Sequence, residues 1–397
     1  MNTHSPAEAE DQDEDSGGSD LHLSEPDNPL GRPMPGGGWS ESITELRDAY
    51  VVPPVESSFV QAAGLLAGDG SYCPQGALWR KWRPLTTEPA MPEGELPVLK
   101  GKWLWGGVLW AHFGHFLAES TTRLWALDKL GEAEGILYIP KRPAVGEEVR
   151  GFQLDFIRQM GTDLPVKVAS EPMRVEHLVV PGPGFGLGEI IAGTQSYRDA
   201  IHARYGSDIP AEGGPKIYIS RSLLGVQRGG LVGEERLEEL LTAEGYEIYH
   251  PQKFSMAEQV ARYKAATHVI AAEGSALHLF AMVARPDQKV AVVLRRQSSA
   301  SNYIEQHLAS FGGSEPLPVQ ALRRIWMPEG TKAKRMGLGE LDFPAVEKLL
   351  AEGGFVSGTA GWPDMRKVEV RRLLGKRAGN LRPMNQRKKA QGGAAED

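Results

Sequence analysis

Cysteine is almost absent from this sequence, since Cys73 is the only one in 397 residues. A lone thiol cannot form a disulfide within the chain, and this usage fits a reducing compartment. Metal-binding patterns are lacking as well: no cluster of His, Cys and Asp has ligand spacing, and no Asp-x-Asp follows a predicted strand. We therefore expect no bound metal and no cofactor.

Long hydrophobic runs and a basic surface are also lacking. The most apolar window, Trp103–Leu117, is interrupted by glycine and histidine and is shorter than the ~20 residues that cross a bilayer. The first residues are acidic, unlike those of a signal peptide. The net charge of −7 disfavours nucleic acid as the main partner. These features predict a cytoplasmic protein without a transmembrane span.

The remaining composition, with 41% hydrophobic and 24% charged residues, is that of a globular protein large enough for two domains. Residues 1–38 are acidic and poor in large apolar groups, which predicts disorder. We expect an N-terminal α/β domain over 39–205 and a second one over 206–325. Residues 326–397 should contain a helix near 343–351 and a basic tail. The tail is either a solvated, partly disordered end or a segment attracted to an anionic membrane surface, such as the inner membrane face, or to the acidic N-terminus.

In the first domain, strands are predicted at 136–140 and 175–180, around a helix near 147–160. Another helix is expected from Phe116 to Leu130, with apolar side chains on one face and His115, Glu119, Thr122 and Arg123 on the other. The segment Val51–Val55 contains two prolines and suggests an extended edge piece.

The second domain repeats a strand, a turn and an amphipathic helix. Glu234–Ala243 should be one helix, and Ser255 with Glu258 forms a capping-box pattern for the next. Strands are expected at 217–219, 247–249, 268–271 and 290–294. Such an alternation predicts a parallel sheet with right-handed crossovers, whose ligands lie beyond the carboxyl ends of the strands.

One strand end has the features of a phosphate site. The strand that ends at Ala272 is followed by Glu273, Gly274 and Ser275 and then directly by a helix. Free backbone N–H groups and the positive end of the helix dipole would face a ligand above this turn. Gly and Ser are also ordinary turn residues, so a purely structural role is the alternative.

Taken together, several segments resemble the catalytic region of the family 61 glycosyltransferases, including bacterial members tied to capsular polysaccharide synthesis. The segments that carry the resemblance are Lys216–Arg221, Arg228, Glu234-Glu235, Tyr246–Pro251, Ser255–Gln259 and Val269–His278, preceded by Gly114–Glu119 and Arg123-Leu124. The resemblance covers Gly106–Ala309. This chain departs from many relatives at Gly233, Glu273 and His278, which weakens the transfer of catalytic detail.

The resemblance implies an inverting glycosyltransferase with two Rossmann-like domains facing a cleft, the architecture called GT-B. The donor would be a nucleotide sugar and the acceptor a glycan or lipid-linked saccharide, in surface polysaccharide synthesis. We expect the second domain to hold the donor through Ser220, Arg221, Glu258, Gln259, Gly274, Ser275, Ala276 and His278. Arg221 would grip the diphosphate, with a surface ion pair as its alternative role. His278 either donates to a phosphate or packs in its helix, and Glu258 either binds ribose or caps a helix.

For the base that deprotonates the acceptor, His115 is the first candidate, because Glu119 at i+4 can orient its ring. Glu273 is the second, and an interior packing role is the alternative for His115. Two other functions stay open for the chain as a whole. One is a nucleotide-sugar epimerase or hydrolase, and the other is a non-catalytic relative that binds glycan or serves as a scaffold.

Overall fold

The structure, a computed structural model of the chain, describes residues 38–80, 83–225, 228–329, 334–376 and 381–383. The predicted disordered segment lies outside the described residues except for Gly38. Arg377 and the basic residues after 383 lie outside them as well.

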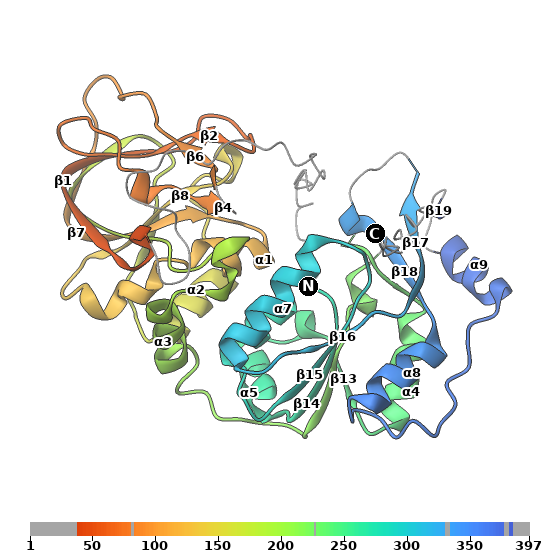
Figure 1. The fold of residues 1–397 in the computed structure, drawn as a ribbon. Coiled ribbons are helices and arrows are strands. Elements are labelled where there is room, and N and C mark those ends of the chain that lie inside the picture. Colours follow the sequence, from red (N-terminus) through yellow and green to blue (C-terminus); the bar gives the residue numbers. More distant parts are fainter. Residues whose placement is uncertain (1–37, 81–82, 226–227, 330–333, 377–380, 384–397) are drawn as a thin grey trace, which may run out of the picture.

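The first half of the chain is built on a six-stranded sheet (Figure 1). Strands β10, β7, β8 and β9 are parallel neighbours, whereas β1 runs antiparallel to both β10 and β3. The order is β3 (Gly64–Leu66), β1 (Ile43–Val52), β10 (Met173–Pro181), β7 (Val98–Leu109), β8 (Gly135–Pro140) and β9 (Val166–Val168). The strands predicted at 136–140 and 175–180 are confirmed, and so is the helix between them, α2 (Gly151–Gln159).

The prediction of an edge piece at Val51–Val55 was wrong. Val51 and Val52 end β1, which lies inside the sheet: Val51 pairs with both Leu65 and Met173. The prolines at 53 and 54 follow the strand and so remove none of its hydrogen bonds. Two short pairs lie beside this sheet, β2 (Gln61–Ala62) with β6 (Thr86–Thr87) and β4 (Trp79–Arg80) with β5 (Arg83–Pro84).

The single helix predicted from Phe116 to Leu130 was also wrong. The chain forms a short helix α1 (Phe113–His115), then a π-helical turn (Phe116–Ser120), and after a break a 3₁₀ helix (Leu124–Lys129). Ser120 donates from its hydroxyl to Val108 O and accepts from Trp110 N, while Thr121 bonds Leu117 O and Tyr197. These side-chain bonds compete with the regular ladder and account for the break.

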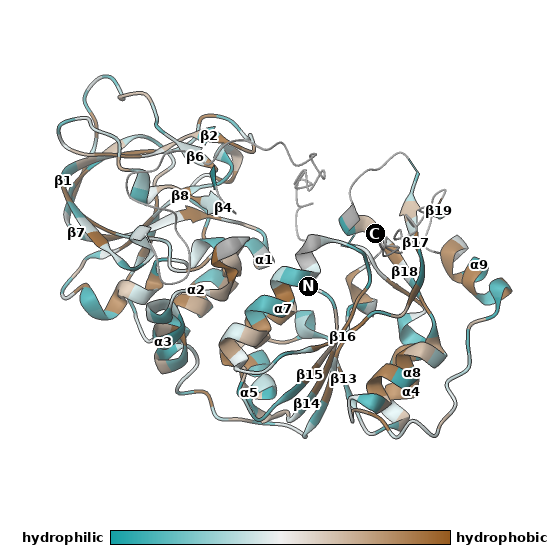
Figure 2. Cartoon of the chain, viewed as in Figure 1, coloured by the Kyte–Doolittle hydropathy of each residue, from teal (hydrophilic) through white to brown (hydrophobic). Residues whose placement is uncertain are grey.

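The second sheet is entirely parallel, as predicted, with the order β13 (Glu247–Tyr249), β11 (Lys216–Ile219), β14 (His268–Ala272), β15 (Lys289–Val293), β16 (Leu317–Val319). Alternate residues of each strand face opposite helix layers. Tyr218 and Ile270 pack with helices α4 (Glu234–Ala243) and α8 (Phe343–Glu352). The other face packs against α5 (Met256–Ala265), α6 (Ala276–Val283) and α7 (Ser299–Gly312). Hydrophobic and hydrophilic residues alternate along these helices (Figure 2).

The chain after Trp326 is more ordered than expected. A third sheet has the order β12 (Gly230–Val232), β18 (Leu338–Leu341), β17 (Leu322–Pro328), β19 (Leu381–Pro383). The predicted helix near 343–351 is confirmed as α8. A helix α9 (Lys367–Lys376) occupies the start of the supposed tail, and its Val370 and Leu374 pack on Val232 of β12. Because these apolar residues are four positions apart, the basic stretch has a face that docks.

One hydrophobic core runs through both halves. It joins residues of the first sheet, such as Leu104 and Leu137, to Val269 and Val292 of the second. Helix α3 (Gln195–Arg204) belongs to the same core through Tyr197 and Ile201. The two sheets are therefore packed together through the helices between them. No helix among the described residues has the length and apolar character needed to span a bilayer.

Candidate active site

The chain order of the parallel sheet reverses direction at β11, whose neighbours are β13 on one side and β14 on the other. In open α/β sheets ligands bind beyond the carboxyl ends of the strands at such a reversal. Ser220–Ser222 follow β11, and Glu273–Ser275 follow β14. The predicted donor residues Ser220, Arg221, Gly274, Ser275 and Ala276 thus lie on the two adjacent strand ends.

Arg221 lies directly over the glycine turn. A Cβ added to Gly274 would be 2.4 Å from Nη1 of Arg221, so glycine at this position allows the guanidinium to approach this closely. Nη2 of Arg221 donates to the carbonyl of Arg228 at 3.0 Å, and the buried Nε of Arg221 has no hydrogen-bond partner. Burial lowers the pKa of Arg221, with Glu234 opposing this shift. A half-buried cation with an unused buried donor is suited to an anionic ligand.

Glu234 holds the Arg221 loop in place. Its carboxylate is 1% exposed and accepts hydrogen bonds from the backbone N–H of Arg221 at 2.7 Å and from the hydroxyls of Tyr218 and Ser220. Burial raises the pKa of Glu234, and the bond from Arg221 N–H opposes the rise. The Ser220 hydroxyl also lies within hydrogen-bond distance of Glu238 and Ser222. Ser220 therefore organises the turn from within it.

Glu273 anchors two arginines that sequence reasoning missed. Its carboxylate is fully buried and accepts from Nε of Arg296 at 2.6 Å and from the backbone N–H of Arg295 at 3.3 Å. Nε of Arg295 donates to the Glu273 carbonyl at 3.1 Å. Burial lowers the pKa of Arg295 well below its usual value, and the charges of Arg221 and Arg296 add to this. The three arginines therefore lie close enough to repel one another.

Backbone amides of the turn between β14 and α6 lie at the same strand end. The first bonds of the helical turn run from Leu277 N to Gly274 O and from His278 N to Ser275 O. The N–H groups of Ser275 and Ala276 precede these bonds and face outward from the helix start.

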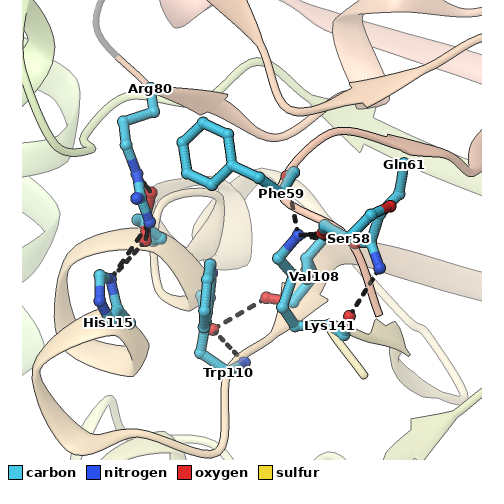
Figure 3. Close-up of polar contacts among 10 residues, drawn as sticks. Ser58, Phe59, Gln61, Arg80, Val108, Trp110, His115 and Lys141 are labelled. Atoms are coloured by element: carbon cyan, nitrogen blue, oxygen red, sulfur yellow. Dashed lines mark hydrogen bonds and ion pairs between the residues drawn. The ribbon is translucent and has the colours of Figure 1, made fainter. Parts of the chain in front are cut away.

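A second polar cluster is formed by His115, Glu119 and Arg80 (Figure 3). Glu119 is buried and binds Nδ1 of His115 at 2.8 Å, while Arg80 donates to both of its oxygens at 2.7 and 2.8 Å. Burial would raise the pKa of Glu119, but Arg80 and then His115 lower it to about 2. The ionised Glu119 can accept a hydrogen bond from Nδ1 of His115 and so orients the ring as a carboxylate orients a catalytic imidazole.

The Arg80–Glu119–His115 cluster is held by aromatic rings and a lysine. Trp110 stacks on His115, with ring centroids 4.5 Å apart. The guanidinium of Arg80 lies 5.4 Å from the ring of Phe59 and 5.5 Å from that of Trp110. The ammonium of Lys141 binds the carbonyls of Ser58 and Phe59 and Oε1 of Gln61 at 2.7 to 3.0 Å, which fixes the loop that carries Phe59 (Figure 3). Arg80 and Lys141 were also missed by sequence reasoning.

The two clusters meet where α1 touches the start of α6. A Cβ added to Gly114 would be 2.8 Å from Cβ of Ser275, so His115 directly follows a residue packed against the turn before α6. His278 lies three positions after Ser275 and therefore on the same side of α6. Burial lowers the pKa of His278 to about 4, and the proximity of His115 adds to this effect.

Glu258 and Gln259 are engaged in local structure. Glu258 accepts from the backbone N–H of Ser255 at 2.7 Å, and Ser255 accepts from Glu258 N, which is the predicted capping box. The Gln259 amide donates to the carbonyls of Pro251 and Phe254. Both hydrogen-bonding groups thus stabilise the loop before α5. Among the described residues, no three or more His, Cys, Asp or Glu side chains are grouped so that they could hold a metal ion.

The fold is thus α/β, with a parallel sheet whose carboxyl edge carries Arg221, Arg295 and Arg296 next to the His115–Glu119 pair. Among known protein families, the family model Glycosyltransferase 61 matches residues 113–291. No curated protein matches the chain significantly. The match over residues 113–291 supports glycosyltransferase activity. The matched region includes His115, Glu119, Arg221 and Glu273, whereas Arg80, Arg295 and Arg296 lie outside it.

Proposed function

We propose that this protein transfers a sugar from a nucleotide diphosphate donor to a hydroxyl group of a glycan or lipid-linked saccharide. The observation that supports this best is the contact between Gly114 and Ser275. Through this contact a histidine that can accept a proton lies beside a strand end rich in arginine.

On the donor side, the diphosphate is bound by Arg221, Arg295 and Arg296 together with the backbone amides of Ser275 and Ala276. Arginine forks bind phosphate oxygens through paired, charge-assisted hydrogen bonds. Charge develops on the diphosphate as the sugar leaves, and fixed cations and amides stabilise it without reorganising. The arginines can therefore take the place of a divalent cation, and we propose a metal-independent reaction.

On the acceptor side, Nε2 of His115 removes the proton as the acceptor oxygen attacks the anomeric carbon. The new C–O bond forms while the bond to the diphosphate breaks, so the anomeric configuration inverts and no covalent intermediate is needed. We assign the base to His115 rather than Glu273, because the Glu273 carboxylate is fully buried and already accepts from Arg295 and Arg296.

The two halves of the chain would have different roles in this reaction. Residues 39–205 would form the acceptor side and 206–325 the donor side of a GT-B-like pair, followed by a C-terminal part over 326–397. The sequence resemblance supports a place in surface polysaccharide synthesis in the cytoplasm. Basic residues on the exposed side of α9, including Lys367, Arg371 and Arg372, support peripheral contact with an anionic inner membrane face.

The test is to incubate the full chain with a panel of nucleotide sugars, with and without saccharide acceptors, and to follow release of the nucleoside diphosphate. A transferase should release it in proportion to the acceptor added and give a product of inverted configuration by NMR. Equal release without an acceptor would indicate a hydrolase. A chain that binds no member of the panel would contradict the proposal and favour a scaffold.

A further inference from the structure

A pair of buried histidines lies directly behind the proposed phosphate site. Nδ1 of His278 on α6 and Nδ1 of His307 on α7 are 3.0 Å apart. His278 is 8% exposed, and His307 is not exposed at all. Two ring nitrogens at this distance share a hydrogen bond, so one Nδ1 carries a proton and the other accepts it.

Both imidazoles are held in their neutral form. Burial, and then the charge of His115, lowers the pKa of His278 to about 4. Burial, and then His278, holds the pKa of His307 well below its usual value. Each neutral ring carries one proton, on either Nδ1 or Nε2. The ring that donates its Nδ1 proton to the other therefore has a bare Nε2, and the ring that accepts this hydrogen bond carries its own proton on Nε2.

The surroundings of His307 favour one of the two arrangements. Its Nε2 is buried without a hydrogen-bond partner, and its ring lies between Phe185 and Phe311, with centroids 4.7 and 4.5 Å away. If Nε2 of His307 carried the proton, that buried N–H would have no hydrogen-bond acceptor. Buried N–H groups without a partner are rarer than unpaired acceptors. The proton of His307 therefore belongs on Nδ1, where it is donated to His278.

This arrangement leaves the proton of His278 on Nε2. Nε2 of His278 is neither hydrogen-bonded nor among the buried unpartnered atoms of the described residues, so it accounts for part of the exposed surface of this side chain. His278 shares a side of α6 with Ser275, which contacts Gly114 next to His115. The exposed N–H thus lies beside the turn to which we assign the diphosphate.

We propose that His307 is a positioning residue that fixes His278 as a neutral Nε2–H donor, and that His278 donates this hydrogen bond to the diphosphate of the donor. The inference rests on the proposed function for its ligand but not for the proton arrangement of the pair. A neutral donor at this place binds the phosphate at any pH well above 4, without titrating.

The proton arrangement is tested first, without ligand, by ¹⁵N NMR of the histidine rings in the full chain. The expected spectrum has a protonated Nε2 on His278 and a protonated Nδ1 on His307. In His307→Leu the ring of His278 should lose this single form and average between two. In His307→Asn, whose amide nitrogen lies near the position of Nδ1, the single form should return. A protonated Nε2 on His307 in the wild-type chain would overturn the arrangement.

The donated bond is then tested with UDP as the probe. His278→Leu removes the donor and should raise the Kd for UDP roughly tenfold or more, whereas His278→Gln places an amide N–H₂ near Nε2 and should stay within about threefold. Addition of UDP should also slow the exchange of the Nε2 proton of His278. Equal affinity of His278→Leu and wild type would overturn the donated bond. Failure of the wild type to bind UDP would reject both the hydrogen bond from His278 to the diphosphate and the proposed nucleotide donor. The ligand-free spectrum would still show which nitrogens of His278 and His307 carry protons.

Discussion

Loss of the charge on Glu119 should destabilise the protein by an amount that can be worked out from its contacts. The carboxylate is buried, binds Arg80 through both oxygens and accepts from His115. Burial acts to raise its pKa, but these partners lower it from 4.5 to about 2. Since the folded-state pKa lies below the unfolded one, the ionised form stabilises the fold above about pH 4.5. This stabilisation is lost as the pH falls toward 2.

A pKa change from 4.5 to about 2 corresponds to about 3 kcal/mol, at ~1.36 kcal/mol per unit. Roughly 1.4 kcal/mol of this should be lost between neutral pH and about pH 3.5, where the unfolded chain has taken up the proton and the folded chain has not. In Glu119→Gln the pH-dependent term is absent from the start, and Arg80 loses its buried partner.

The assay is urea unfolding of both proteins from about pH 7 down to pH 3.5. The wild type should lose roughly 1.4 kcal/mol more than Glu119→Gln over this interval. Glu45→Gln is a matched control, since Glu45 also binds a histidine, His177, at 2.7 Å but has a carboxylate that is 56% exposed. Its pair should contribute no more than about 1 kcal/mol. Parallel loss of stability in the wild type and Glu119→Gln would refute this account of Glu119.

Three further predictions concern neighbouring groups. Lys141→Met leaves three oxygens of the Phe59 loop without their donor and should lower the unfolding free energy by about 1 to 3 kcal/mol, whereas the same change at the exposed Lys253 should have little effect. Glu273→Gln should destabilise the fold by about 3 to 5 kcal/mol in urea, because the Arg296 guanidinium loses its buried anionic partner; normal stability with lost turnover would instead make Glu273 the base. Turnover should survive excess EDTA. Loss of turnover in EDTA, with recovery on addition of Mn²⁺ or Mg²⁺, would reveal a metal requirement.

The sequence was most informative for the parallel sheet. Its strands are short apolar runs that end in marked turns, so the positions of Arg221 and Gly274 followed from local patterns. The capping box at Ser255 was visible for the same reason. Such signals depend only on residues a few positions apart.

The parts that were missed depend on contacts between distant segments. Nothing near Arg80 in the sequence indicates that it meets Glu119, 39 positions later. His307 lies in a helix whose pattern gives no sign of its partner 29 positions earlier. Arg295 and Arg296 had a usable signal, since they directly follow a predicted strand at the ligand-binding edge of the sheet. The helix expected from Phe116 to Leu130 was interrupted by side-chain hydrogen bonds that periodicity does not report.

The most direct test of the central claim is calorimetric titration of UDP into the wild type, Arg221→Ala and His115→Ala, with turnover measured on the same preparations. The account predicts that Arg221→Ala weakens UDP binding by about 1.5 to 3 kcal/mol, the range for a hydrogen bond to a charged group. His115→Ala should bind UDP as the wild type does, while kcat falls by roughly 10² to 10⁴. Unchanged UDP affinity in a folded Arg221→Ala protein, or normal turnover per folded molecule of His115→Ala, would contradict it.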